Sequence, residues 1–293
     1  MNQRTGQLGL QSLVGVAMIT CLLTPLTASA EADKPMNVLF FGNSFTSWAG
    51  SVTGRFIKIA EAAGHPKPFV GGQLINGRAL ASHIKIVEKS PENSVRSARL
   101  PKGEKWDYVV MQGLSTEATH LYNPNFEKDA LKLFQLVKKD ASGNGAKVTG
   151  VLYATWARRD LIEKKKFPTL EAMQTEIREG YEGAAALINK TEGKDSVTIA
   201  RVGDAFEAMG FPAWIYEPRG YHQSPQGALL AAMVIYRTIY GGNLSDIAYD
   251  KVKKWAPATE EEWKQLVVAA DKKPTPKKLN ATQPATAPAE PDK

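Results

Sequence analysis

The chain has 293 residues, 43% of them hydrophobic, and a formal net charge of +7. This is enough apolar material for one sizeable core, and the only cysteine, Cys21, lies near the amino terminus. The rest of the chain contains no cysteine, so it cannot form disulfides, carry out thiolate chemistry or bind a metal through cysteine sulfur. No basic stripe is interleaved with aromatic residues, and the lysines of 163–167 are typical of a solvated helix edge, so we expect no nucleic-acid partner.

The first thirty residues have the pattern of a cleavable signal peptide. Arg4 is the only charge before Glu31, an apolar stretch spans 13–23, and the small residues Ala28 and Ala30 close the segment. A membrane anchor is the rival interpretation, but the apolar stretch is shorter than the roughly 20 residues that a spanning helix needs. We therefore expect cleavage after Ala30, no stable membrane span, and a secreted or periplasmic protein.

After the leader, short apolar runs alternate with longer segments that have helical spacing. The runs predict strands at 37–42, 67–72, 107–112, 147–155 and 196–203. The longer segments predict helices at 54–64, 123–140, 170–190, 224–240 and 259–270. Asn-Pro opens the second of these helices, Ser-Pro the fourth, and a Thr-x-x-Glu capping box the last.

Buried strands that alternate with helices favour a mostly parallel sheet covered on both faces. The sequence therefore predicts a single three-layer α/β/α domain at 34–271. The residues that follow, 272–293, are rich in proline, alanine and lysine and almost lack large apolar groups. They cannot bury enough surface to order themselves, so we expect a disordered tail.

Functional groups of open α/β sheets collect beyond the carboxyl ends of the strands. The first predicted strand ends in Gly-Asn-Ser, which places Ser44 at that edge, although a serine there can also simply cap a helix. A nucleophilic serine needs a base. Among the four histidines, only His222 stands on a loop just before a helix expected to pack on the sheet; the others are His65, His83 and His120. Ser44 and His222 are therefore the candidate nucleophile and base.

Four short blocks resemble the SGNH/GDSL hydrolase superfamily, in a branch with Gly-Asn-Ser at the nucleophile. They are FGNSFT at 41–46, NGRALASH at 76–83, VVMQGLS at 109–115 and IYEPRGYHQSPQGALLAA at 215–232. The blocks follow the family's order and span nearly the whole predicted domain. The resemblance implies a flavodoxin-like sheet and ester hydrolysis without a metal or an organic cofactor.

The resemblance also implies a role for each matching residue. Ser44 would attack an ester carbonyl, and His222 would take its proton. The oxyanion hole would use the backbone N–H groups of Ser44 and Gly77, with the side-chain amide of Gln112 as a third donor. The alternatives are a turn glycine at Gly77 and, at Gln112, a strand-end residue that satisfies loop backbone.

One position departs from the family's pattern and leaves the triad acid open. An aspartate usually stands three residues before the histidine, but here that residue is Arg219, a cation that would disfavour a charged histidine. Glu217 is the candidate acid, and Asp204 is an alternative from a neighbouring strand exit. A Ser–His dyad assisted by a backbone carbonyl is the third possibility.

Trp156 and Arg158 resemble a recurrent feature of the branch, and we expect them to line the substrate cleft. The alternative is ordinary core packing for the tryptophan and a surface cation for the arginine.

The resemblance implies a secreted serine ester hydrolase that acts through an acyl-enzyme. We expect it to remove acetyl or other short acyl groups from a carbohydrate, because exported members often deacetylate polysaccharides. Alternatives are a lipid or lysophospholipid esterase, and a non-catalytic glycan-binding protein that lost the triad acid. Metal-dependent hydrolysis is disfavoured, because the sequence has no His-x-x-x-His or clustered carboxylate pattern.

Overall fold

The computed structural model describes residues 34–90, 100, 104–122, 124–139 and 148–272. The chain separates into two units, 1–34 and 35–293, and the description below concerns the second. The predicted signal peptide and all but the first residue of the predicted tail lie outside the described residues. Within the described ranges, no helix combines the length and the apolar character needed to cross a membrane.

A parallel sheet lies at the centre of the fold, in the strand order β2-β1-β3-β4-β5. Its five strands in the described part of the chain are β1 (Asn37–Gly42), β2 (Phe69–Leu74), β3 (Tyr108–Met111), β4 (Thr149–Tyr153) and β5 (Val197–Ala200). Every residue of β1 is buried, because helices cover both faces of the sheet. The structure thus confirms the predicted α/β sheet and its flavodoxin-like order.

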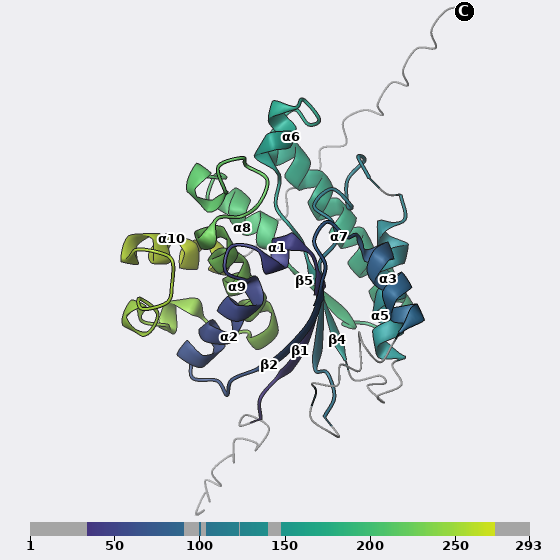
Figure 1. Ribbon diagram of the computed structural model, residues 1–293, viewed down its shortest axis with the longest axis horizontal. Helices are drawn as coiled ribbons and strands as arrows, with labels where there is room; N and C mark the ends of the chain where they lie inside the picture. The colour runs from purple at the N-terminus through teal and green to yellow at the C-terminus, as the bar shows by residue number, and fades with distance from the viewer. Residues whose placement is uncertain (1–33, 91–99, 101–103, 123, 140–147, 273–293) are drawn as a thin grey trace, which may run out of the picture. The chain divides into compact units, whose positions relative to one another are not determined.

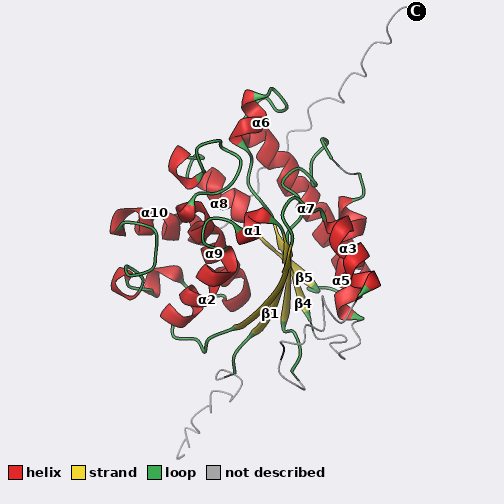
Figure 2. Cartoon of the chain, viewed as in Figure 1, coloured by secondary structure: helices red, strands yellow, loops and turns green. Residues whose placement is uncertain are grey.

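The helices form one layer on each face of the sheet (Figures 1 and 2). One layer contains α2 (Val52–Ala62), α8 (Val202–Ala208), α9 (Pro225–Tyr240) and α10 (Glu260–Asp271). The other contains α3 (Leu80–Lys89), α5 (Phe126–Lys138) and α7 (Leu170–Glu192). Crossovers between parallel strands are right-handed. The chain runs from β1 to β2 on one side and then returns to β3 on the other side of β1, so the connecting helices change to the opposite face of the sheet at β1.

Helix starts follow the capping residues in the sequence. The Ser224 side chain accepts a hydrogen bond from the N–H of Gly227, and Pro225 occupies the first helical position of α9. Thr259 and Glu262 form the predicted capping box of α10. Short helices also lie at α1 (Ser44–Ser47) and α6 (Arg159–Glu163), with single 3-10 turns at Ala213–Ile215, Leu244–Asp246 and Tyr249–Lys251.

The end of the last strand differs from the sequence prediction. The run at 196–203 alternates like one continuous strand, yet β5 ends at Ala200 and α8 begins at Val202. The N–H of Gly203 donates to the carbonyl of Ala154 at 3.0 Å. This close approach to the end of β4 turns the chain into a helix and brings α8 over the carboxyl edge.

Candidate active site

The chain leaves β1 at the point where the strand order reverses, which in open α/β sheets is where ligands bind. Ser44 is the first residue of α1, and it follows Asn43, whose side chain caps that helix by accepting from the N–H of Phe45 at 3.1 Å. The Ser44 side chain is 6% exposed. The local sequence therefore places a hydroxyl at the carboxyl edge of the sheet, as predicted.

Gln112 is fully used in holding this turn, which corrects its predicted role as an oxyanion donor. Its Oε1 accepts from the N–H of Asn43 at 3.0 Å and from Oγ1 of Thr46 at 2.9 Å. Its Nε2 donates to Oδ1 of Asn43 at 3.0 Å and to the carbonyl of Gly113. Both donor hydrogens are thus directed into buried loop groups, as in the strand-end alternative, and Gln112 holds the turn that carries Ser44.

Asn43 is a residue of the candidate site that the sequence reasoning did not single out. Its Nδ2 donates to the carbonyl of Arg78 at 3.0 Å and to that of Gly113 at 3.4 Å. The side chain is completely buried. Asn43 therefore joins the exits of β1, β2 and β3, and its place immediately before the candidate nucleophile was the only available signal.

The structure brings His222 to Ser44 although 178 positions separate them: Nε2 lies 2.9 Å from Oγ. The loop that carries the histidine is held to α1, because Nε2 of Gln223 donates to the carbonyl of Phe45 at 3.1 Å. Burial lowers the pKa of His222 below its ordinary value, and the Arg219 and Arg158 cations lower it further, whereas Glu217 and Asp160 oppose this. A neutral imidazole at this position can accept the Ser44 proton.

The predicted acid, Glu217, does not contact the imidazole. One of its oxygens accepts from the backbone N–H groups of Tyr221 and His222 at 3.2 and 3.4 Å. The other accepts from the N–H and Nε of Arg219, both at 3.2 Å. Glu217 thus stabilises the loop's backbone and acts on the His222 imidazole only through its charge. The Arg219 side chain is largely exposed and points to Glu217 rather than to the ring.

The alternative acid, Asp204, is tied up elsewhere. Its carboxylate pairs with Nε of Arg178 at 3.0 Å and with Nη1 of Arg201 at 3.4 Å. Nδ1 of His222 is buried and has no hydrogen-bond partner among the described residues. The observed arrangement is therefore a Ser–His dyad.

The two backbone N–H groups predicted as oxyanion donors are not used in hydrogen bonds to described residues. In the part of the chain that the structure describes, the N–H groups of Ser44 and Gly77 donate to no protein acceptor. Gly77 has φ +68°, a left-handed conformation that favours glycine, and an added Cβ there would meet open space. Their role as oxyanion donors stays a prediction.

Trp156 is a core residue, which corrects the expectation that it lines the cleft. Its side chain is completely buried and stacks on Phe45 at a centroid distance of 4.4 Å and on Phe206 at 4.7 Å. Its ring packs against Phe45 of α1, which agrees with the alternative of ordinary core packing.

Arg158 reaches the site indirectly. Its guanidinium binds both oxygens of Asp160 at 2.9 and 2.8 Å and Oγ of Ser115 at 3.2 Å. It also lies 3.7 Å from the ring centroid of Tyr221, whose ring centroid lies 4.1 Å from that of His222.

Trp48 is a second residue that the sequence reasoning missed. Its side chain is 48% exposed, and its ring stacks on the His222 imidazole with a centroid distance of 5.3 Å and an interplanar angle of 15°. The next three residues, 49–51, all have positive φ, at +56°, +86° and +64°. Such backbone is unfavourable for alanine and serine and clusters at functional sites.

Glu117 is a buried carboxylate on the loop after β3. It accepts from the N–H of Leu114 at 2.7 Å and from the N–H of Leu80, at the start of α3, at 3.1 Å. Burial raises its pKa to about 7, although these two N–H donors oppose the rise. Glu117 thus joins the β3 exit to the segment that carries Gly77.

Among the described residues, none of the other three histidines hydrogen-bonds the candidate nucleophile. His65 stacks on Tyr240, and the exposed His120 pairs with Glu176. His83 is completely buried, and burial lowers its pKa to about 4. Within the described ranges, no group of three or more potential metal-ligating side chains occurs.

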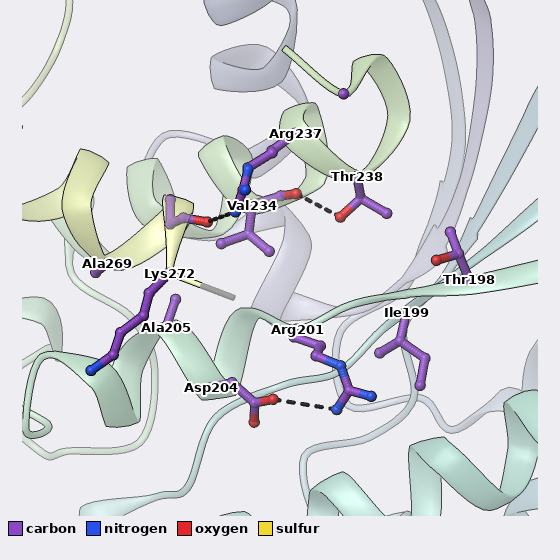
Figure 3. Close-up of a pocket in the computed structure, with 12 residues that line it drawn as sticks. Thr198, Ile199, Arg201, Asp204, Ala205, Val234, Arg237, Thr238, Ala269 and Lys272 are labelled. Carbon is purple, nitrogen blue, oxygen red and sulfur yellow. Dashed lines mark hydrogen bonds and ion pairs between the residues drawn. The ribbon is translucent and has the colours of Figure 1, made fainter. Parts of the chain in front are cut away.

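A separate cavity of about 370 Å³ lies beside the open edge of β5 (Figure 3). Both arginines that line it have partners within the protein: Arg201 pairs with Glu182 at 2.8 Å and with Asp204, and Arg237 pairs with Asp271 at 3.2 Å. Neither Ser44 nor His222 lines this cavity.

Comparison with solved structures shows an SGNH/GDSL hydrolase-like fold. A protein from Slackia heliotrinireducens with a provisional assignment as an SGNH hydrolase is 25% identical, with a TM-score of 0.54, over 70% of this chain and 100% of that chain. A DUF4886 family protein from Bacteroides uniformis is 18% identical, with a TM-score of 0.62, over 81% and 93%. A protein from Parabacteroides merdae, provisionally named a GDSL-like lipase, is 17% identical, with a TM-score of 0.52, over 71% and 97%. No family model and no curated protein matches the chain.

Proposed function

Starting from the SGNH/GDSL hydrolase-like fold, we propose that this protein is a serine ester hydrolase that removes acetyl or other short acyl groups from a carbohydrate. The observation that carries the proposal is the 2.9 Å contact between Oγ of Ser44 and Nε2 of His222 at the carboxyl edge of the sheet. A hydroxyl in hydrogen-bond reach of a neutral imidazole is the arrangement that activates serine for attack.

The reaction follows from this geometry in two steps. Oγ of Ser44 attacks the ester carbonyl while Nε2 of His222 takes the hydroxyl proton, and the negative charge on the carbonyl oxygen is stabilised by the backbone N–H groups of Ser44 and Gly77. The C–O bond to the alcohol then breaks as Nε2 returns the proton to the leaving oxygen, which leaves an acyl-serine. Water activated by the same nitrogen hydrolyses that ester and regenerates the hydroxyl.

The small exposure of the site supports a short acyl group. Ser44 is 6% exposed and His222 is 9% exposed, so little of either residue is open to solvent. A short acyl group needs less space beside them than a long acyl chain does. The carbohydrate part of the proposal rests on the family resemblance, and export rests on the leader.

The test is hydrolysis of p-nitrophenyl acetate by the wild type, Ser44→Ala and His222→Ala, with His120→Ala as a matched control. Because Ser44 and His222 act as a unit, each substitution is expected to lower kcat by at least about 10³-fold, whereas the exposed His120 variant keeps wild-type activity. Since the base must be unprotonated, kcat/KM should fall as the pH falls through a pKa below 6.5. Equal turnover by all four proteins would refute the proposal.

The substrate class is tested with the same proteins. Acetylated oligosaccharides should be hydrolysed in preference to octanoyl esters of the same alcohol, and the reverse preference would favour the lipid esterase. Recovery of the protein outside the cytoplasm, with an amino terminus at residue 31, would support export.

A further inference from the structure

The imidazole of His222 lacks the third group that normally orients a catalytic histidine. Nε2 contacts Ser44, but Nδ1 is buried and has no hydrogen-bond partner among the described residues. Glu217, the nearest predicted acid, uses its carboxylate on backbone N–H groups and on Arg219. Something other than a carboxylate must therefore hold the ring toward the hydroxyl.

Three aromatic rings surround the imidazole. Tyr221 lies at a centroid distance of 4.1 Å with an interplanar angle of 37°, and Phe45 lies at 5.6 Å and 49°. Trp48 lies at 5.3 Å and is the most nearly parallel, at 15°. Two of the three have strong competing contacts, because Tyr221 also binds the Arg158 guanidinium and Phe45 also stacks on Trp156. Trp48 is therefore the ring most available to His222.

The backbone fixes the position of Trp48. Its N–H donates to the carbonyl of Ser44 at 2.9 Å, and its carbonyl accepts from the N–H of Ser51 at 3.1 Å. The buried Arg55 lies beneath this turn and donates from Nη1 to the carbonyl of Ser51 at 3.4 Å. An exposed tryptophan held by left-handed backbone over a candidate base is a costly arrangement that requires a reason.

We propose that Trp48 is a positioning residue for His222, whose stacked indole takes over the part that a carboxylate on Nδ1 would play. This rests on the proposed function. The indole keeps the imidazole plane directed at Ser44, and its electron-rich face favours the imidazolium that forms when Nε2 takes the proton. Because that cation exists only after proton transfer, the interaction is stronger in the transition state than in the ground state and raises kcat.

The charged groups that face His222 do not replace this contact. Glu217 and Arg219 lie on its own loop, and Arg158 and Asp160 lie at the start of α6. The two acids favour the imidazolium and the two cations disfavour it, and each acid is itself paired with one of these arginines. The indole carries no charge that an ion pair could cancel, so its effect on the imidazolium adds to that of the charged groups.

The test compares Trp48→Phe with Trp48→Leu. Both substitutions keep an apolar cover on the imidazole, so both retain its burial, but only phenylalanine keeps an aromatic face. We expect Trp48→Phe to stay within about threefold of wild-type kcat, and Trp48→Leu to lose about tenfold in kcat with KM changed less than twofold. The His222 pKa, followed by NMR of histidine-labelled protein, should be lower by about half a unit or more in the leucine variant than in the phenylalanine variant.

Two outcomes would overturn this inference. Equal kcat and equal His222 pKa in the two variants would show that Trp48 is only an apolar cover. A rise in KM with unchanged kcat and pKa would make it a substrate-binding residue instead. The NMR comparison needs no turnover, so a wild type without Ser44-dependent hydrolysis would refute the proposed function while the effect of Trp48 on the His222 pKa remained measurable.

Discussion

Replacing Glu117 with glutamine is expected to change how the stability of the protein depends on pH. The carboxylate is fully buried, and its pKa is raised from 4.5 to about 7. A raised pKa means that the folded protein binds the proton more tightly than the unfolded chain does, so its contribution to stability is fully present below pH 4.5 and is lost as the pH rises to about 7. One pH unit corresponds to about 1.4 kcal/mol, so wild type should lose about 3 kcal/mol across this window through Glu117 alone.

Glutamine does not titrate, and its carbonyl oxygen can still accept from Leu114 and Leu80. The free energy of unfolding of Glu117→Gln, measured by urea denaturation, should therefore exceed that of wild type by an amount that grows between pH 5 and pH 7 and is constant above about pH 8. Glu61→Gln, at an exposed position of α2, should follow wild type throughout. A difference between Glu117→Gln and wild type that stays flat from pH 5 to pH 8 would refute the reasoning.

Two further predictions concern the same edge of the sheet. Gln112→Ala leaves buried groups of Asn43 and Thr46 unpaired, so urea denaturation should show a loss of about 2–4 kcal/mol; a large fall in kcat at unchanged stability would instead restore Gln112 as an oxyanion donor. Gly203→Ala would press a Cβ against the carbonyl oxygen of Thr155 and Nε2 of Gln174, so its Tm should fall with a loss of at least about 2 kcal/mol. Gly54→Ala in α2, whose added Cβ would make only an ordinary contact with Cβ of Ser51 at 3.9 Å, should be neutral or stabilising, and equal Tm shifts for the two glycine variants would contradict this.

The layers and the contact between Ser44 and His222 could be predicted because they depend on patterns that lie along the sequence. A buried strand followed by Gly-Asn-Ser, and a histidine one turn before an apolar helix, place two groups at one sheet edge whatever the loops do. The strand boundary at Ala200 could not be predicted, because Val, Thr and Ile before it suit a strand and so does Val202 after it. The backbone contact of Gly203 that ends β5 joins two segments far apart in the chain.

The errors within the site have the same cause. The sequence shows that Gln112 and Trp156 follow strands, but not whether each side chain turns toward solvent or inward. Gln112 turns inward to Asn43, and Trp156 turns between two phenylalanines. Trp48 and Glu117 were overlooked for the opposite reason: each lies in a loop, where a tryptophan or a glutamate alone carries no signal. Trp48 is marked by the left-handed backbone that follows it, and Glu117 is marked by its burial. Only the folded chain shows these features.

The great separation along the chain between the serine and its imidazole has a consequence for biosynthesis. A ribosome that has made β1 to β5 and α8 has already made the alcohol and most of the sheet, but it has not yet made the group that can activate the alcohol. Contacts between such distant segments also form late, since a long loop must close first. A chain that ends before residue 222 lacks one member of this pair, so under the proposed function ester cleavage would report that synthesis has passed residue 222 and that the two segments have met.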